Sequence, residues 1–516
     1  MPCGRAALWL GLIRRMGVRA VIDTLLPTES EIPHGAVIEV LMLSRLLDPH
    51  PLSRIEDWMR ASGVDVLLGH DAAKFNDDRI GRTLDALGDK VRDAQTALTT
   101  GLILAFALRT IDAHYDTTSL WLEGAYDDSE LAARGHSKDG RGDHKQVVVG
   151  TVTTEDGEVP LAHAVHRGNT GDVSTVPEAL RSLRACVPHD PVVISGDSVM
   201  GSRANMDAVA AAEGIFLGPI AMGPKVVEWV CAAEPTIEVA VSLLRQKEPV
   251  RYLACVASRF AVNGVAEAGT HLVIFDPRRA QQEATERTRA LARLETGLDA
   301  LAASLNQGRL KTLDAAKKKL RALPTRHGLA ARYLNAELVT EGDSMSLRRT
   351  RDEAALAAAP GRDGRWPLVT NRSGLSDEEL CTWAVRRYKT HGRIERDHHL
   401  LKGPLAVRPL FVQNDARIRS LVAVCVWALT AWKLMERQAP GALASMPKSG
   451  RPKASLVERI EAFFQAIALV RFRVGNNVRQ SVSALPSRTQ SLLHSLGWHR
   501  EVRGILDDAT HAQLQV

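Results

Sequence analysis

The segment from Tyr388 to Lys402, YKTHGRIERDHHLLK, contains the residues whose types and spacing best suit chemistry. On one continuous helix, Tyr388, His391, Glu395 and Lys402 would share a stripe about 60° wide, because successive helical residues are about 100° apart. The stripe combines an aromatic ring, a carboxylate and two potential cations. Further cations surround it: Arg386, Arg387, Lys389, Arg393, Arg396, His398 and His399. The pattern predicts a metal-binding carboxylate that faces a polyanion; the alternative is an ordinary solvated helix face.

Two further acids lie at strand positions upstream. Asp116 is in HYDTTSLWLE, whose β-branched and aromatic residues predict a strand. Asp197 ends the apolar run PVVISGD, and a helix is predicted to begin near Arg203. Ligand sites gather at the carboxyl ends of such strands, so both acids are candidates for one site. Asp112 is a second candidate for the first acid, although a helix or turn position before the strand is expected for it.

Three carboxylates from Asp116, Asp197 and Glu395 suit two Mg²⁺ or Mn²⁺ ions, because hard divalent cations prefer oxygen ligands. Such a site can activate water or a 3′-hydroxyl and stabilise the leaving oxygen. Phosphodiester cleavage and strand transfer are then one reaction with different nucleophiles. The predicted catalytic and metal-binding residues are therefore these three acids.

A second set of residues is predicted to contact DNA. Lys402 and His391 would pair with phosphates, which positions a strand without reading its bases. Tyr388 would stack or hydrogen-bond near the scissile end. The remaining candidates are Arg393 and Arg396 beside the stripe, and Lys138 and Arg141 in the loop GHSKDGR.

Composition permits a DNA partner without requiring one. The chain has 516 residues, is 45% hydrophobic and 24% charged, and has a net charge of +6. These values are typical of a soluble protein of several domains, and the clustering of its cations matters more than the total. Six scattered cysteines without zinc spacing predict reduced thiols in the cytoplasm and no structural zinc.

Membrane insertion is not expected. The N-terminal apolar run is too short for a good signal peptide. The longest later run, Leu421 to Trp432, is about 12 residues, whereas a membrane span needs about 20. That run is predicted to be a buried helix.

The order of predicted elements after residue 101 is β-β-β-α-β-α-β, with the first three strands antiparallel. This order predicts an α/β fold with an RNase H-like mixed sheet, flanking helices and an α+β insertion between the second and third acids. Leu291, Leu294, Leu298, Leu301 and Leu305 repeat at 3-4-3-4 and predict a helical hairpin in the insertion. The expected domains are a helical N-terminal region with possible DNA binding (1–100), the first part of the core (101–220), the insertion (221–365), the second part of the core (366–440), and a basic linker with a helical C-terminal region (441–516).

The spacing of Tyr388, Glu395 and Lys402 resembles the Y-x2-R-x3-E-x6-K signature of bacterial insertion-sequence DDE transposases, in the branch related to insertion-sequence family four. YDTTS at 115–119, GHSKDGR at 135–141 and GNTGD at 168–172 also resemble this branch, and the resemblance covers most of residues 75 to 435. It implies an RNase H-like core, metal binding by the three acids, and the element's terminal inverted repeats and target DNA as substrates. It further implies a homodimer in the synaptic complex and a bacterial cytoplasmic protein that joins the nucleoid when bound to DNA.

The sequence departs from the signature at His391, which stands where the family has Arg and weakens a bidentate phosphate clamp. Two other functions stay open. One is a DNA-binding derivative of a transposase that no longer cuts. The other is an RNase H-like nuclease without strand transfer.

Overall fold

A computed structural model describes residues 1–511 except 111, 172–173, 188–191, 198–199, 243–247, 263–264, 327, 343, 392–393, 406, 409, 413, 445–454 and 475–476. The side chains of 265–267, 309, 324–326, 390–391, 394–395, 471, 473–474 and 477–479 also lie outside the described part. The chain forms two compact units. The first comprises Met1–Ile215 and Thr390–Val516, and the second comprises Phe216–Lys389.

The first unit begins with helices only. They are α1 (Gly4–Arg15), α2 (Val18–Leu25), α3 (His34–Leu47), α4 (Ile55–Ser62), α5 (Val64–Leu68), α6 (Asp77–Gly88) and α7 (Val91–Phe106). The side chain of Asn76 accepts a hydrogen bond from the amide of Arg79 and so caps the N-terminus of α6. α1 and α3 are buried along most of their length, so these helices belong to the core of the unit.

A sheet with the order β3-β2-β1-β4 follows these helices. Its strands are β1 (Asp112–Trp121), β2 (Gln146–Thr154), β3 (Pro160–Arg167) and β4 (Val193–Ser195). β2 pairs antiparallel with both β1 and β3, whereas β4 runs parallel to β1. Helices α8 (Val176–Cys186) and α9 (Arg203–Ala211) flank β4 in the chain. The strand order and directions confirm the predicted RNase H-like mixed sheet with flanking helices. Asp112 is the first residue of β1, so its expected helix or turn position is wrong.

The long helix α16 (Asp415–Leu443) belongs to the part of the first unit that runs from Thr390 to Val516. Most of its residues are buried. It is long and apolar enough to cross a membrane, but 89% of its most apolar window is buried inside the protein. The expectation of a buried helix across Leu421 to Trp432 is therefore confirmed. α16 packs against α3, α6 and β3, which ties the N-terminal helices to the sheet.

The C-terminal segment differs in part from its prediction. Its helices are α17 (Leu456–Ala462), α18 (Ser487–Leu496) and α19 (His499–His511), and its strands β12 (Leu469–Val474) and β13 (Asn477–Val482) form an antiparallel hairpin. The hairpin differs from the helical C-terminal region expected for 441–516, because α17 ends at Ala462 and β12 begins at Leu469. α19 packs against α1, so the two ends of the chain meet within one unit.

The second unit contains the strand order β5-β11-β8-β7-β6. The strands are β5 (Ile215–Pro219), β6 (Ile237–Val241), β7 (Val250–Val262), β8 (Val265–Phe275) and β11 (Arg365–Thr370), accompanied by α10 (Pro224–Ala232) and α14 (Asp377–His391). Ser376 and Glu379 form a capping box at the start of α14, since each side chain accepts a hydrogen bond from the other residue's amide.

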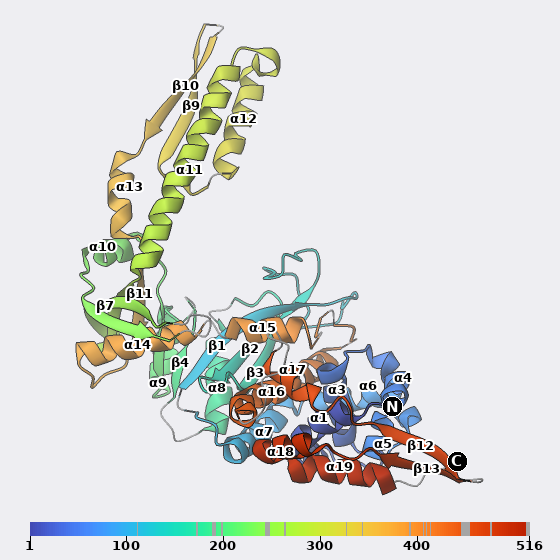
Figure 1. Cartoon of the computed structure of the whole chain (residues 1–516). Helices are drawn as coiled ribbons and strands as arrows, with labels where there is room; N and C mark the ends of the chain where they lie inside the picture. The colour runs from blue at the N-terminus through green and yellow to red at the C-terminus, as the bar shows by residue number, and fades with distance from the viewer. Residues whose placement is uncertain are drawn as a thin grey trace. The chain divides into compact units, whose positions relative to one another are not determined.

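A helical hairpin projects from the second unit's sheet region (Figure 1). It consists of α11 (Pro277–Ser304) and α12 (Leu313–Arg326), beside the antiparallel strands β9 (Leu334–Glu341) and β10 (Ser344–Arg351) and the short α13 (Glu353–Ala358). Leu291, Leu294, Leu298 and Leu301 are buried along α11, which confirms the predicted leucine seam.

The helix expected from Tyr388 to Lys402 is described in two parts, α14 up to His391 and α15 (Ile394–Lys402). The two residues between them, 392–393, lie outside the described residues. Tyr388 belongs to the second unit and Lys402 to the first.

Candidate functional site

The register of two parallel strands brings the first two predicted acids together. His114 of β1 pairs with Ser195 of β4, the last residue of that strand. A Cβ placed on Gly196 would lie 3.5 Å from the carbonyl oxygen of Tyr115, which extends the same register by one residue. If this register continued past the end of β4, Asp116 would be level with Asp197. Level residues of neighbouring parallel strands share a face and lie about 4.8 Å apart, so both carboxylates would then belong to one place on the sheet.

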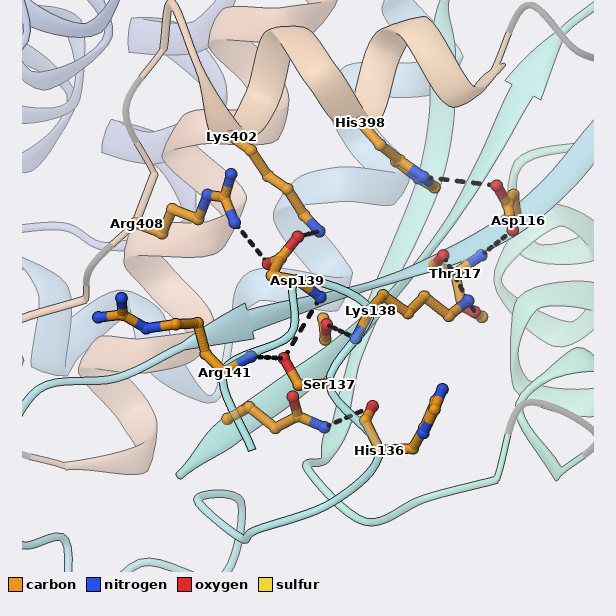
Figure 2. A network of polar contacts seen from close by, with 12 residues as sticks. Asp116, Thr117, His136, Ser137, Lys138, Asp139, Arg141, His398, Lys402 and Arg408 are labelled. Atoms are coloured by element: carbon orange, nitrogen blue, oxygen red, sulfur yellow. Dashed lines mark hydrogen bonds and ion pairs between the residues drawn. The ribbon is translucent and has the colours of Figure 1, made fainter. Parts of the chain in front are cut away.

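Asp116 is held by its own strand and by α15 (Figure 2). Its Oδ1 accepts a 2.7 Å hydrogen bond from the amide of Thr117, and its Oδ2 lies 3.4 Å from Nδ1 of His398. His398 is 7% exposed, and its Nε2 lies 3.1 Å from Oγ1 of Thr151 on β2. Because Thr151 is the register partner of Asp116, the imidazole fixes α15 directly above this pair of strands.

The third predicted acid lies on the same helix. Glu395 is in α15, one turn before His398, but its side chain lies outside the described residues. The side chain of His391 and the whole of Arg393 are outside them too. The adjacent histidines His398 and His399 differ as expected for neighbouring helical residues, since the first is buried and the second is exposed.

Lys402, a predicted phosphate contact, is paired within the protein (Figure 2). Its Nζ donates a 2.8 Å hydrogen bond to Oδ1 of Asp139, and its side chain is 10% exposed. Nη1 of Arg408 lies 2.5 Å from Oδ2 of the same carboxylate. Burial lowers the pKa of Lys402, while Asp139 opposes that shift. Two cations therefore converge on one acid of the loop that connects β1 to β2.

The neighbouring loop residue Lys138 reaches back to β1. Its Nζ donates to the carbonyl oxygen of Thr117 at 2.9 Å and to Oγ1 of Thr117 at 2.6 Å. Thr117 follows Asp116, so the loop braces the strand beside the first acid. Arg141 places its guanidinium 4.7 Å from the ring centroid of Trp121, and its amide donates to Oγ of Ser137.

The other predicted DNA contacts lie in different surroundings. Arg396 is about half exposed, and its Nη2 lies 3.9 Å from Oε2 of Glu158. Tyr388 is partly buried in the second unit, where it packs against an apolar cluster and its ring lies 6.5 Å from that of Trp366. Asp116, Asp197 and α15 thus belong to the first unit, and Tyr388 belongs to the second.

A buried charge cluster was missed by sequence reasoning. Nζ of Lys433 on α16 lies 2.7 Å from Oε2 of Glu158, 2.9 Å from Oε2 of Glu436 and 3.1 Å from Oδ1 of Asp397. Asp397, on α15, is 1% exposed, and burial raises its pKa to about 7 against the lowering effect of Lys433. A lysine within the most apolar helix was the available signal, because a buried ammonium needs nearby carboxylates.

The donor set of Asp116 and Asp197 fits a hard divalent cation. Both are carboxylates, Asp116 lies in β1 and Asp197 follows the neighbouring strand β4, and Asp116 keeps 15% of its side chain exposed. Among the side chains that the structure describes, no group of three or more His, Cys, Asp or Glu forms a ready metal cage. The side chain of Glu395 stands outside that set, so the two aspartates make up the described part of the candidate site.

Comparisons with known proteins add three findings. Residues 6–99 match a domain of unknown function (DUF4277), which corresponds to helices α1 to α7. No curated protein matches the chain. Among solved structures, the chain is similar to the piggyBac transposase in the cryo-EM structure of its synaptic complex with hairpin DNA. The TM-score is 0.36 and the identity 8%, over 99% of this chain and 85% of that chain.

Proposed function

We propose that this chain is a DNA transposase of the DDE class, which cleaves DNA at the terminal inverted repeats of an insertion sequence and joins the ends to target DNA. Asp116, Asp197 and Glu395 are its metal-binding acids in this proposal, with Mg²⁺ or Mn²⁺, two ions, as cofactor. The protein acts as a homodimer on paired ends, in the cytoplasm of a bacterium and at the nucleoid when bound to DNA.

The observation that supports the proposal is the meeting of three chain segments at one point of the sheet. β1, which contains Asp116, runs parallel to β4, which ends two residues before Asp197, and His398 of α15 lies 3.4 Å from Asp116. Glu395 precedes His398 by one helical turn in the same element. The residues are far apart in the sequence, yet the fold gathers the segments that contain them, as a three-carboxylate site requires.

Cleavage of a phosphodiester requires a phosphorus atom that is polarised by nearby positive charge and a DNA strand that is held in position. Two divalent ions, when bound, would activate the attacking oxygen and stabilise the leaving oxygen. Asp116 and Asp197 would hold them with oxygen ligands, while His398 and the amide of Thr117 orient the carboxylate of Asp116. Lys402 and Arg408 supply positive charge beside α15 for the phosphates of the strand.

A cleavage assay tests the proposal. The purified protein is mixed with labelled DNA that carries the inverted repeats flanking its gene, in Mg²⁺ or Mn²⁺. Metal-dependent cuts at the repeat ends are expected. They should fall by at least about a thousandfold in Asp116→Asn, Asp197→Asn and Glu395→Gln, since metal ions contribute several kcal/mol to such transition states.

Asp112→Asn is the matched control, because it changes an acid at the start of the same strand, four residues before Asp116. It should cut like the wild type. Repeat-specific binding without cutting in either metal would favour the silent DNA-binding derivative. Cutting that ignores the repeats would favour a general nuclease.

A further inference from the structure

Asp139 occupies the position between two cations that a DNA phosphate would take. Lys402 and Arg408 approach the two oxygens of its carboxylate, at 2.8 Å and 2.5 Å. They come from α15 and from the segment that follows it, whereas Asp139 lies in the loop between β1 and β2. A phosphodiester also presents two charged oxygens to paired cations, so the carboxylate and a backbone phosphate are chemically interchangeable here.

We propose that Lys402 and Arg408 form a binding site for a backbone phosphate of DNA and that Asp139 fills this site until DNA displaces it. This inference rests on the proposed function, because the polyanion is taken to be the transposon end. Asp139 is thus a built-in competitor, and Arg408 is a further positioning residue for the strand.

The charges of this cluster favour a carboxylate that DNA can displace over an ion pair that only stabilises the fold. Two cations surround one carboxylate, so the cluster retains net positive charge when Asp139 is in place. Lys402 is 10% exposed, and its burial disfavours the charged form unless an anion lies close to it. A phosphate can take over that role when Asp139 leaves.

Of the three side chains in the cluster of Lys402, Arg408 and Asp139, that of Arg408 is the most accessible to solvent. Its side chain is 29% exposed and lines a cavity of about 590 Å³. Arg45, Arg417 and Phe411 line the same cavity, and Phe411 is 69% exposed. Of the arginines, Arg417 is neutralised by Asp85 at 2.7 Å. A DNA strand can therefore approach Arg408 from the side of this cavity, whose lining contains Arg45 and Arg417 together with Asp77.

Other contacts would hold the loop between β1 and β2 in place if DNA displaced the Asp139 carboxylate. Lys138 stays bonded to Thr117, and the amide of Lys138 donates to Oγ of Ser119 at 3.1 Å. Departure of the Asp139 carboxylate leaves these bonds to β1 intact. The contact is therefore suited to opening without loss of the strand that contains Asp116.

The test is equilibrium DNA binding by fluorescence anisotropy, in Ca²⁺ and over a range of salt, with a repeat duplex and a scrambled duplex. Asp139→Asn should bind both duplexes at least about fivefold more tightly than the wild type, which is the lower range of coupling between competing ligands. It should also show a steeper dependence on salt, because a phosphate then meets both cations without a competing carboxylate.

Asp143→Asn is the matched control. It removes the same charge from the same loop, but Asp143 is 72% exposed and contacts His144, not Lys402. Its affinity should stay within about twofold of the wild type, since exposed charges are screened. If Asp139→Asn binds no better than Asp143→Asn, the proposal is overturned.

Arg408→Gln tests the site even if Asp139→Asn fails to fold. It should weaken binding and lower the salt slope by about 1, as expected for the loss of one phosphate contact. In the Arg408→Gln background, Asp139→Asn should increase the affinity for DNA much less than it does in the wild type. An unchanged salt slope in Arg408→Gln would overturn the proposal. If the wild type does not prefer the repeat, the proposed function fails instead, and the scrambled duplex still decides the role of Asp139, because phosphate contacts are independent of sequence.

Discussion

Replacing Lys433 by methionine should destabilise the first unit strongly. Lys433 is 4% exposed and is the shared partner of Asp397, Glu158 and Glu436. Methionine fills a similar volume but removes the charge. Asp397, 1% exposed, would then be left in an apolar site beside a second carboxylate.

The magnitude follows from which charges lose their partner. Removing one member of a buried ion pair costs about 3–5 kcal/mol, because the other charge stays buried and uncompensated. Arg396 offsets little of this, since it lies 3.9 Å from Glu158 and is about half exposed. The free energy of unfolding should therefore fall by about 3–5 kcal/mol.

Urea denaturation followed by tryptophan fluorescence measures the loss. The double variant Lys433→Met with Asp397→Asn is the control, because it also removes the carboxylate that would be stranded. It should recover at least half of the loss. A loss below about 1 kcal/mol in the single variant, or no recovery in the double variant, would refute the view that these charges hold α15 to α16.

Two further predictions concern other buried groups. Glu39 in α3 is fully buried, and burial raises its pKa from 4.5 to about 7, while Arg14 and Arg19 lower it and Asp23 raises it. A raised folded-state pKa stabilises the protein below pH 4.5, and this stability is lost as the pH rises through 7. The shift of about 2.5 units corresponds to about 3 kcal/mol, so Glu39→Gln should gain up to that amount over the wild type at pH 8 and little at pH 4.5. Denaturant unfolding at the two pH values measures the difference, and equal effects at both would contradict the assignment. In the second unit, Leu298→Ala should cost about 2–5 kcal/mol, because Leu298 is 1% exposed in the α11 seam. Leu329→Ala, at a position 39% exposed, is the control and should cost less than about 1 kcal/mol in the same thermal or urea melts; similar losses for both would count against a packed seam.

Local patterns predicted the sheet well. The β-branched and aromatic run around Asp116 and the apolar run before Asp197 were sufficient to identify β1 and β4. Strand order then followed from the sequence of elements, because short connections favour antiparallel neighbours and a crossover helix favours a parallel one. The parallel pairing of β1, which contains Asp116, with β4, which ends two residues before Asp197, was thus within reach of sequence reasoning.

Two features depended on information that local patterns lack. The stripe from Tyr388 to Lys402 assumed one helix within one unit, whereas Tyr388 lies in the second unit and Lys402 in the first. The pairing of Lys402 with Asp139 joins residues 263 positions apart, so no spacing rule could reveal it. The β12–β13 hairpin had a signal that was misinterpreted, because LVRFRV alternates and is rich in valine.

Strand transfer tests the central claim most directly. A pre-cut repeat end with a free 3′-hydroxyl is incubated with a supercoiled target plasmid and Mg²⁺, and joined products are counted on a gel and sequenced. The wild type and Asp112→Asn should join the ends to the plasmid, whereas Asp116→Asn, Asp197→Asn and Glu395→Gln should not. Joining that persists in Asp197→Asn, or a wild-type protein that cuts repeat DNA but never joins it, would contradict the account.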